Sequence, residues 1–130
     1  MKKLLIIPML FMCSMVIGQS KKIIGKPIQI EHLEVAQNDF PKKMTWYEAK
    51  KACYALGSRW RLPTKDELNL LYTNKNEIGG FAIGDYWTNG NYWSSTQGNS
   101  YGAWVQSLNF GGQSDFNKSD TYNVRAVRAF

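Results

Sequence analysis

Aromatic and amide side chains gather between residues 86 and 101, where their types suit ligand binding. Aromatic faces stack on the apolar C–H faces of sugar rings, while side-chain amides exchange hydrogen bonds with sugar hydroxyls. This mixture predicts a carbohydrate-binding set of loops. In the alternative interpretation, Trp87 packs in the core and the asparagines make turns. The predicted ligand-binding residues of this stretch are Tyr86, Trp87, Asn89, Asn91, Gln97, Asn99 and Tyr101.

A basic band precedes this stretch in the sequence. Residues 40–65 contain seven lysines and arginines but only one acidic residue, Glu48. Such a band suits a polyanion, of which sulfated polysaccharide, nucleic acid and an anionic membrane surface are examples. We expect a polysaccharide and no nucleic acid. The predicted contacts are Lys42, Lys43 and Arg59, whereas Lys50 and Lys51 fit a solvated helix face equally well.

No set of side chains in the sequence fits catalysis. Ser94 and Ser95 have no histidine near them in the sequence to serve as a general base, and His32 is the only histidine of the chain. We therefore expect hydrogen-bonding roles for the serines and a structural or solvent-exposed His32. The prediction is a protein that is not an enzyme and needs no cofactor.

One run of residues begins like a calcium-binding loop. Oxygen-bearing side chains occupy its first, third and fifth positions, starting at Asp115, but the glycine expected sixth is Asp120 and the glutamate expected twelfth is Ala126. The run is therefore not an EF-hand. A looser calcium site formed by Asp115, Asn117 and Asp120 remains an open alternative, and no metal site is predicted.

The first eighteen residues have the layout of a secretory signal peptide. Lys2 and Lys3 precede an apolar run over residues 4–17, and small Gly18 follows. We expect residues 1–18 to be removed on export, residues 19–27 to form a flexible leader, and residues 28–130 to form one domain. The product would be secreted, periplasmic or on the outer surface. Lipidation of Cys13 is an alternative, although Met12 before it is large for such a site.

Two threonines predict the helix starts. Thr45 and Thr64 are each followed three residues later by glutamate, which is the capping-box pattern. The first helix then runs from residue 45 to Gly57 with Cys53 on its buried face, and the second covers residues 65–74. Before the second helix, residues 60–62 are extended because Pro63 restricts Leu62, so Trp60 and Leu62 face the core.

The remaining segments read as strands and turns. Residues 28–35 predict one bulged strand or two short strands. A hairpin centred on an Asn-Gly turn is expected over residues 85–96, followed by strands at 103–110, 113–117 and 124–130. Helices followed by a mostly antiparallel sheet make an α+β fold. In the last strand, we expect Arg125 or Arg128 to pair with Asp66 or Glu67 while the other arginine faces solvent.

Across residues 30–130 the chain resembles the family of the Legionella collagen-like protein C-terminal domain, in the C-type-lectin-like superfamily. The resemblance implies two helices packed on a twisted, mostly antiparallel sheet with long variable loops. The matching segments are Thr45-Trp46, residues 49–53, Leu56-Gly57, Trp60-Arg61-Leu62-Pro63-Thr64, Glu67-Leu68, Gly79-Gly80-Phe81, residues 92–96, Ala103-Trp104 and residues 124–128.

The resemblance also implies a bacterial binding module at the cell surface or in the medium. The family's namesake is similar to an adhesin module that binds sulfated glycans. Two other activities of the superfamily do not fit: formylglycine-generating oxidases use a cysteine pair near the end of the domain, and calcium-dependent lectins use Glu-Pro-Asn or Gln-Pro-Asp. The chain has no cysteine after Cys53 and neither tripeptide. The alternative function is a structural or assembly subunit whose aromatic loops bind a protein partner or a second copy.

Overall fold

Two capping boxes start the main helices, as predicted. In the computed structural model, which describes residues 18–84 and 90–130, α2 (Trp46–Ala55) follows Thr45 and α3 (Lys65–Thr73) follows Thr64. Each threonine hydroxyl accepts the N–H of the glutamate three residues on, and each glutamate accepts the threonine N–H. A short helix, α4 (Lys75–Ile78), follows directly after α3.

The first sheet brings the two ends of the domain together. Strands β1 (Ile28–Ile30), β2 (Leu33–Val35) and β6 (Val127–Ala129) are antiparallel in the order β1-β2-β6. The turn between β1 and β2 places Glu31 at φ 52°. Residues 28–35 therefore form two short strands, which is one of the two predicted arrangements.

The second sheet supports the loops. Strands β3 (Asn91–Gln97), β4 (Gly102–Ser107) and β5 (Gln113–Asn117) are antiparallel in that order, with a register shift between Trp93 and Gln97. Strand β5 matches its predicted bounds of 113–117. Strand β4 ends at Ser107, three residues before its predicted end, and a turn follows. The first arm of the hairpin expected over residues 85–96 falls on residues outside the described ranges.

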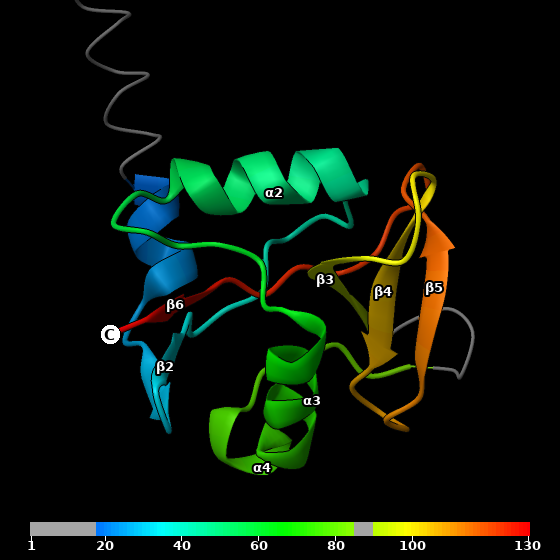
Figure 1. Ribbon diagram of the computed structural model, residues 1–130. Helices are drawn as coiled ribbons and strands as arrows, with labels where there is room; N and C mark the ends of the chain where they lie inside the picture. Colours follow the sequence, from blue (N-terminus) through cyan, green and yellow to red (C-terminus); the bar gives the residue numbers. More distant parts are fainter. Residues whose placement is uncertain (1–17, 85–89) are drawn as a thin grey trace, which may run out of the picture.

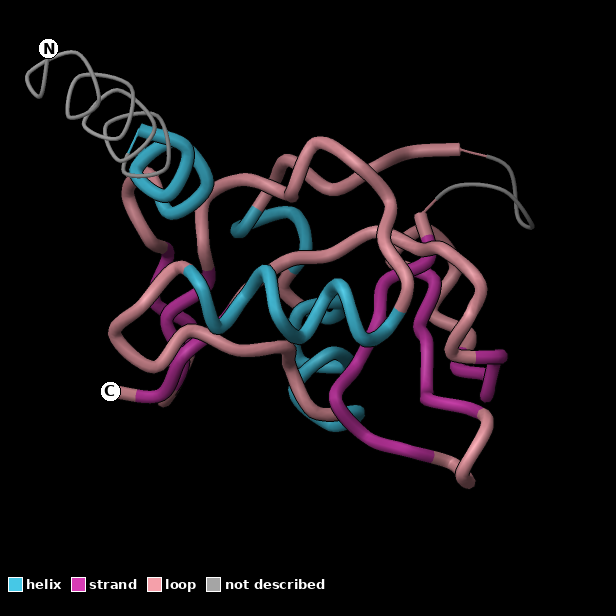
Figure 2. The backbone as a smooth tube through the Cα atoms, turned by 90° about the horizontal axis from the view of Figure 1, so that it is seen from above, coloured by secondary structure: helices cyan, strands magenta, loops and turns pink. Residues whose placement is uncertain are grey.

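In Figure 1, α2 crosses the top of the molecule, with the first sheet below it on the left and the second sheet on the right; seen from above in Figure 2, it lies between the strands of the two sheets. Its inner face buries Ala49 and Cys53 completely, as predicted from their spacing. Trp60 and Leu62, each 2% exposed, join the same apolar cluster, which confirms that both face the core. Between them, Arg61 forms a two-hydrogen-bond bridge with Val127, so this segment is tied to β6.

The start of the described chain corrects one expectation. Residues 18–24 form a helix, where the sequence predicted a flexible leader over residues 19–27. Ile23 is buried, and the carbonyls of Ile23 and Ile24 accept hydrogen bonds from Asn38 and Gln37. Two adjacent isoleucines thus give the segment apolar surface to bury. The predicted cleavage after Gly18 stays a prediction.

The arginine partners were predicted wrongly. Arg125 is fully buried and its Nε donates to Asp39 at 2.7 Å, while Arg128 pairs with Glu34 at 3.2 Å. The physical reason is that residues 124–126 are buried and lie before β6, so the alternating faces of a strand do not apply to Arg125. Within residues 18–84 and 90–130, no helix has the length and apolar character needed to span a bilayer.

Candidate functional site

A shallow pocket with largely apolar walls, to which three basic side chains contribute, lies between α2 and the extended segment 60–62. Its volume is about 350 Å³. We call it the basic pocket, and its lining residues are Lys50, Lys51, Tyr54, Trp60, Arg61, Leu62 and Ser95.

Helix α2 presents three of these side chains because of its periodicity. Lys50, Lys51 and Tyr54 are exposed, while Ala49 and Cys53 are buried. Residues 50 and 54 are one turn apart and therefore lie on the same side of the helix. The ammonium group of Lys50 is 4.4 Å from the centroid of the Trp46 ring, a cation–π distance. One wall of the pocket therefore combines positive charge with the exposed Tyr54 ring.

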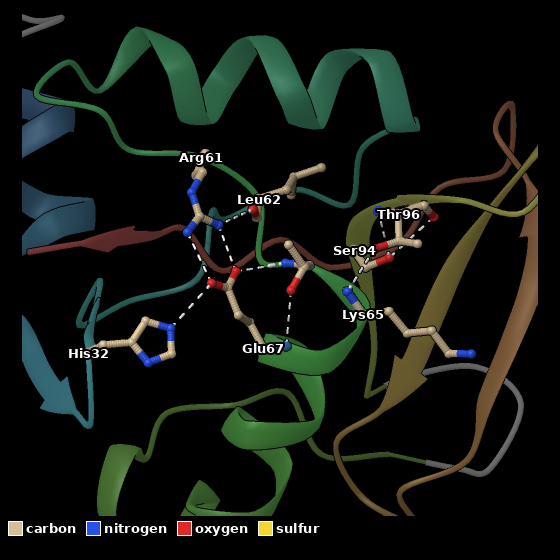
Figure 3. A network of polar contacts seen from close by, with 8 residues as sticks. His32, Arg61, Leu62, Lys65, Glu67, Ser94 and Thr96 are labelled. Atoms are coloured by element: carbon tan, nitrogen blue, oxygen red, sulfur yellow. Dashed lines mark hydrogen bonds and ion pairs between the residues drawn. The ribbon is translucent and has the colours of Figure 1, made fainter.

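Arg61 forms the other wall and is held by Glu67 (Figure 3). Its Nη1 and Nη2 donate to the two carboxylate oxygens of Glu67 at 2.6 and 3.0 Å, and Nη1 also donates to the Leu62 carbonyl. These bonds use three of the five guanidinium N–H groups. Within the described residues the other two N–H groups have no protein partner, so the guanidinium is held in place and retains capacity for an anion.

Glu67 is ionised and is itself fixed by the cap of α3. Burial alone would raise the pKa of Glu67, but hydrogen bonds from Arg61 and from the Thr64 backbone outweigh burial and place that pKa below its ordinary value. The hydrogen bonding between the Arg61 and Glu67 side chains also raises the pKa of Arg61. On the far side of Glu67, His32 Nε2 lies 3.8 Å from the Oε2 atom (Figure 3).

The side chains beyond Glu67 in this network are structural. Thr96 accepts a hydrogen bond from the Lys65 backbone N–H at 2.9 Å, and the Lys65 ammonium lies 3.5 Å from the centroid of the Trp104 ring. Ser94 is fully buried and its hydroxyl donates to the Trp104 carbonyl at 2.7 Å. Ser94 therefore has the hydrogen-bonding role predicted for it.

The predicted basic contacts are not one surface. Lys42 and Lys43 precede the first turn of α2 and line a separate groove of about 710 Å³ that also borders residues 18–24. Arg59 follows the last turn of α2, and a helix of ten residues is about 15 Å long. Arg59 is exposed in a turn with φ 66°. The basic band is thus divided into the groove, the basic pocket and this turn.

The predicted loop residues are partly brought together. Gln97, Asn99 and Tyr101 gather at the turn between β3 and β4, whereas Asn91 is half-buried at the start of β3. Asn99 accepts the N–H groups of Tyr101 and Gly102, both at 2.8 Å. Tyr86, Trp87 and Asn89 lie outside the described ranges.

Lys118 connects this turn to α2. Its ammonium donates to the Gln97 side chain at 2.6 Å and to the Ser100 carbonyl at 3.2 Å, and it lies 4.5 Å from the centroid of the Trp46 ring. Gln97 and Asn99 therefore form hydrogen bonds within the turn. For Asn99 this agrees with the alternative interpretation, in which the asparagines make turns and do not bind a ligand. Tyr101, in the same turn, is 77% exposed.

The loose calcium site gains no support from the geometry. Within the described residues, no three or more His, Cys, Asp or Glu side chains are grouped as metal ligands. Asn117 accepts hydrogen bonds from the N–H and hydroxyl of Ser119 at 2.9 and 2.8 Å, which makes a turn. The carboxylate of Asp115 lies where a Cβ atom on Gly98 or Gly102 would be, so Asp115 packs against the β3–β4 turn.

The basic pocket itself was not predicted. Lys50, Lys51 and Arg61 were recognised as part of the basic band, but they were not chosen as contacts, and Tyr54 was not considered. One sequence signal could have found it: Lys50 and Tyr54 are one helical turn apart and lie on the flank of the helix next to the buried Ala49 and Cys53. The approach of residues 60–62 to that helix face is tertiary and has no local signal.

Solved structures and a family model identify the fold. A chain in a solved complex of botrocetin with a mutant von Willebrand factor A1 domain superposes with a TM-score of 0.55 at 9% identity, covering 82% of this chain and 98% of that one. Botrocetin alone gives a TM-score of 0.51 at 14% identity, with the same coverage. The fold is therefore C-type-lectin-like and α+β, as predicted.

No curated protein sequence matches the chain. The model of the Lcl C-terminal domain, in contrast, matches residues 27–128, which include α2 to α4, strands β1 to β5 and all of β6 but its last residue, Ala129. The chain therefore belongs to the family of the Lcl C-terminal domain, the C-terminal domain of Legionella collagen-like protein.

Proposed function

We propose that the chain is an exported, non-enzymatic binding module that recognises anionic glycans through the basic pocket. The observation that carries the proposal is the meeting of Lys50, Lys51 and Arg61 with the exposed Tyr54 around one pocket. Cations attract sulfate and carboxylate groups, while a tyrosine face accepts the apolar side of a sugar ring.

The charge distribution supports an anionic ligand. The full chain carries a formal net charge of +6, and removal of Lys2 and Lys3 with residues 1–18 leaves 6 − 2 = +4, which still favours encounter with polyanions. Among the described residues, Arg61 is the pocket cation that binds a carboxylate, whereas the Lys50 ammonium lies over the Trp46 ring. Lys50 and Lys51 are therefore the side chains that we expect to contribute most to polyanion affinity.

Heparin affinity at fixed pH tests the proposal. Changing Lys50 and Lys51 to alanine removes two charges at the pocket, so we expect the Kd for heparin to rise by about two- to thirtyfold. The double variant K21A/K26A is the matched control, because it removes two exposed lysines away from the pocket. Equal weakening by both double variants would show that only the overall charge matters and would contradict the pocket.

A second variant separates sugar recognition from charge alone. Tyr54 is 83% exposed, so Tyr54→Ala should leave the fold intact while removing the stacking surface. We expect weaker binding of heparin and unchanged binding of inorganic polyphosphate, which has no sugar ring. The same loss for both polymers would assign Tyr54 no role in sugar recognition.

A protein partner is the second candidate. Tyr47 and Tyr101 are 59% and 77% exposed. Lys118 lies between them: its ammonium is 5.8 Å from the centroid of the Tyr47 ring, and its backbone N–H donates to the Tyr101 carbonyl. Botrocetin, which is similar in fold, was solved in complex with a protein domain. Light scattering at several concentrations and co-purification test this candidate, and a monomer without a partner would contradict it.

Export is tested separately on the protein recovered from its native cell envelope or medium. We expect an N-terminus at Gln19, measured by intact mass and N-terminal sequencing. Lipidation of Cys13 would instead place the N-terminus at that cysteine, and an intact Met1 would contradict processing.

A further inference from the structure

His32 is brought next to Glu67 by the pairing of the domain's ends. His32 lies in the turn between β1 and β2, whereas Glu67 is in the first turn of α3. His32 Nε2 is 3.8 Å from the Oε2 atom of Glu67, and 63% of the His32 side chain is exposed. The same Oε2 atom accepts the Nη2 hydrogen bond from Arg61 at 3.0 Å. One carboxylate oxygen thus lies between an imidazole and a guanidinium.

The charged groups around His32 are few. Glu31 precedes it in the turn, Glu67 faces it from α3, and Arg61 lies behind that carboxylate. On the neighbouring strands, Glu34 and Arg128 pair with each other at 3.2 Å. Phe130, the residue after β6, contacts His32 through its backbone: its N–H donates to the His32 carbonyl.

We propose that His32 regulates the basic pocket by sharing the carboxylate of Glu67 with Arg61, so that anionic polymers bind more tightly as pH falls. This inference rests on the proposed function. Histidine is the side chain that changes charge between about pH 5 and 8. When His32 is neutral, Arg61 and Glu67 cancel each other's charge. When His32 is protonated, the three side chains together carry one positive charge.

Protonation also changes the charge balance around Glu67. A protonated imidazole beside Oε2 offsets part of the negative charge that otherwise neutralises Arg61. The Arg61 N–H groups that have no protein partner within the described residues stay available for a sulfate or carboxylate. Glu67 remains a carboxylate through this range, because its pKa is below the ordinary glutamate value. The switch therefore adds positive charge beside the pocket while Arg61 stays bound to Glu67.

The test is the Kd for heparin at constant ionic strength, measured at about pH 7.5 and about pH 5.5. His32 is the only histidine in the sequence, so His32→Gln removes every imidazole at once. We expect the unchanged protein to bind about two- to fivefold more tightly at the lower pH, the range for one exposed charge. His32→Gln should lose most of this change while keeping the affinity measured at the higher pH.

Glu67→Gln is the second variant, and glutamine at this position keeps the capping box. It should bind heparin more tightly than the unchanged protein at the higher pH, because Arg61 is no longer neutralised, and its response to pH should be smaller. A full pH response in His32→Gln would overturn this inference alone. Absence of heparin binding at both pH values would overturn the proposed function and the inference together.

Discussion

Glu67 joins two parts of the fold through one carboxylate. It accepts the N–H of Thr64 at the start of α3 and binds Arg61 through both oxygens. Only 13% of its side chain is exposed, so these bonds are partly shielded from water. Removing the charge should therefore affect both the helix start and the segment before it.

The lowered pKa of Glu67 predicts an acid dependence of stability. A carboxylate whose pKa is lower in the folded state stabilises that state above its unfolded pKa, and this stabilisation is lost as pH falls through the folded pKa. We expect the unchanged protein to exceed Glu67→Gln in unfolding free energy at neutral pH, with the difference shrinking below about pH 4.5. Urea unfolding at several pH values measures it. A difference that does not depend on pH would contradict the ion pair as its source.

Breaking the pair between Arg125 and Asp39 should cost far more stability than breaking the pair on β2 and β6. Arg125 is fully buried and its remaining nitrogens donate to the carbonyls of Ala36 and Gly79, so removing Asp39 leaves a buried charge without a carboxylate. We expect Asp39→Ala to cost about 3 kcal/mol or more in urea unfolding. Glu34→Ala, which breaks the half-exposed pair with Arg128, is the matched control and should cost about 1 kcal/mol or less. Equal losses would contradict burial as the cause.

Local residue patterns were predicted well and long-range partners poorly. Both capping boxes span three residues, so the sequence alone identifies donor and acceptor at Thr45 and Thr64. The partners of Arg125 and Arg128 are 86 and 94 residues away, and neither could be found without the strand pairing. The same reason explains why Arg125 or Arg128 was predicted as a partner of Glu67, which instead binds Arg61.

The turn between β4 and β5 depends on a glycine. Gly111 has φ 89°, a left-handed conformation that L side chains rarely adopt. A Cβ atom there would also lie 2.6 Å from the Tyr72 ring on α3. Position 111 thus sets both the turn and the approach of the second sheet to α3.

Alanine at two glycines separates these effects. Gly57 has φ 80° but open space around its would-be Cβ, so Gly57→Ala should cost about 1–2 kcal/mol from backbone strain alone. Gly111→Ala should cost about 1 kcal/mol more, because the Tyr72 ring must move. Chemical unfolding of both variants measures the difference. Equal costs would show that Tyr72 yields without penalty.

The elements were predicted where the sequence has a local period or a cap. Helices α2 and α3 and strand β5 follow from such signals, and the structure confirms them. Strand β6 is shorter than the alternation over residues 124–130 indicated, because residues 124–127 are all buried and hydrogen bonding outside the strand satisfies part of their backbone. The helix at residues 18–24 was missed because its burial depends on residues 36–38.

At the scale of the whole molecule, β6 closes the fold. Val127 pairs with Val35 on β2 and with Arg61 in the segment before α3, and Val127 and Val35 are both fully buried in one apolar cluster. The last strand therefore joins the first sheet to the segment that lines the basic pocket. Its contribution to stability should be out of proportion to its three residues.

A chain shortened to end at Ala126 tests this closure. Removing β6 exposes Leu33 and Val35 and breaks the bridge to Arg61, so we expect loss of cooperative urea unfolding and of near-ultraviolet circular dichroism. Removing only Phe130, which is 59% exposed, is the control and should preserve both signals. Cooperative unfolding of the shorter chain would contradict the role given to β6.

The meeting of β1 and β6 in one sheet gives the domain a polarity. Both ends of the fold lie on one side, whereas the β3–β4 turn with Tyr101 lies across α2 on the other (Figure 1). A carrier joined to either end would hold the domain by the same side. The turn would then project away from the carrier whichever end is attached, and the basic pocket on the flank of α2 would stay open to a long polymer passing alongside.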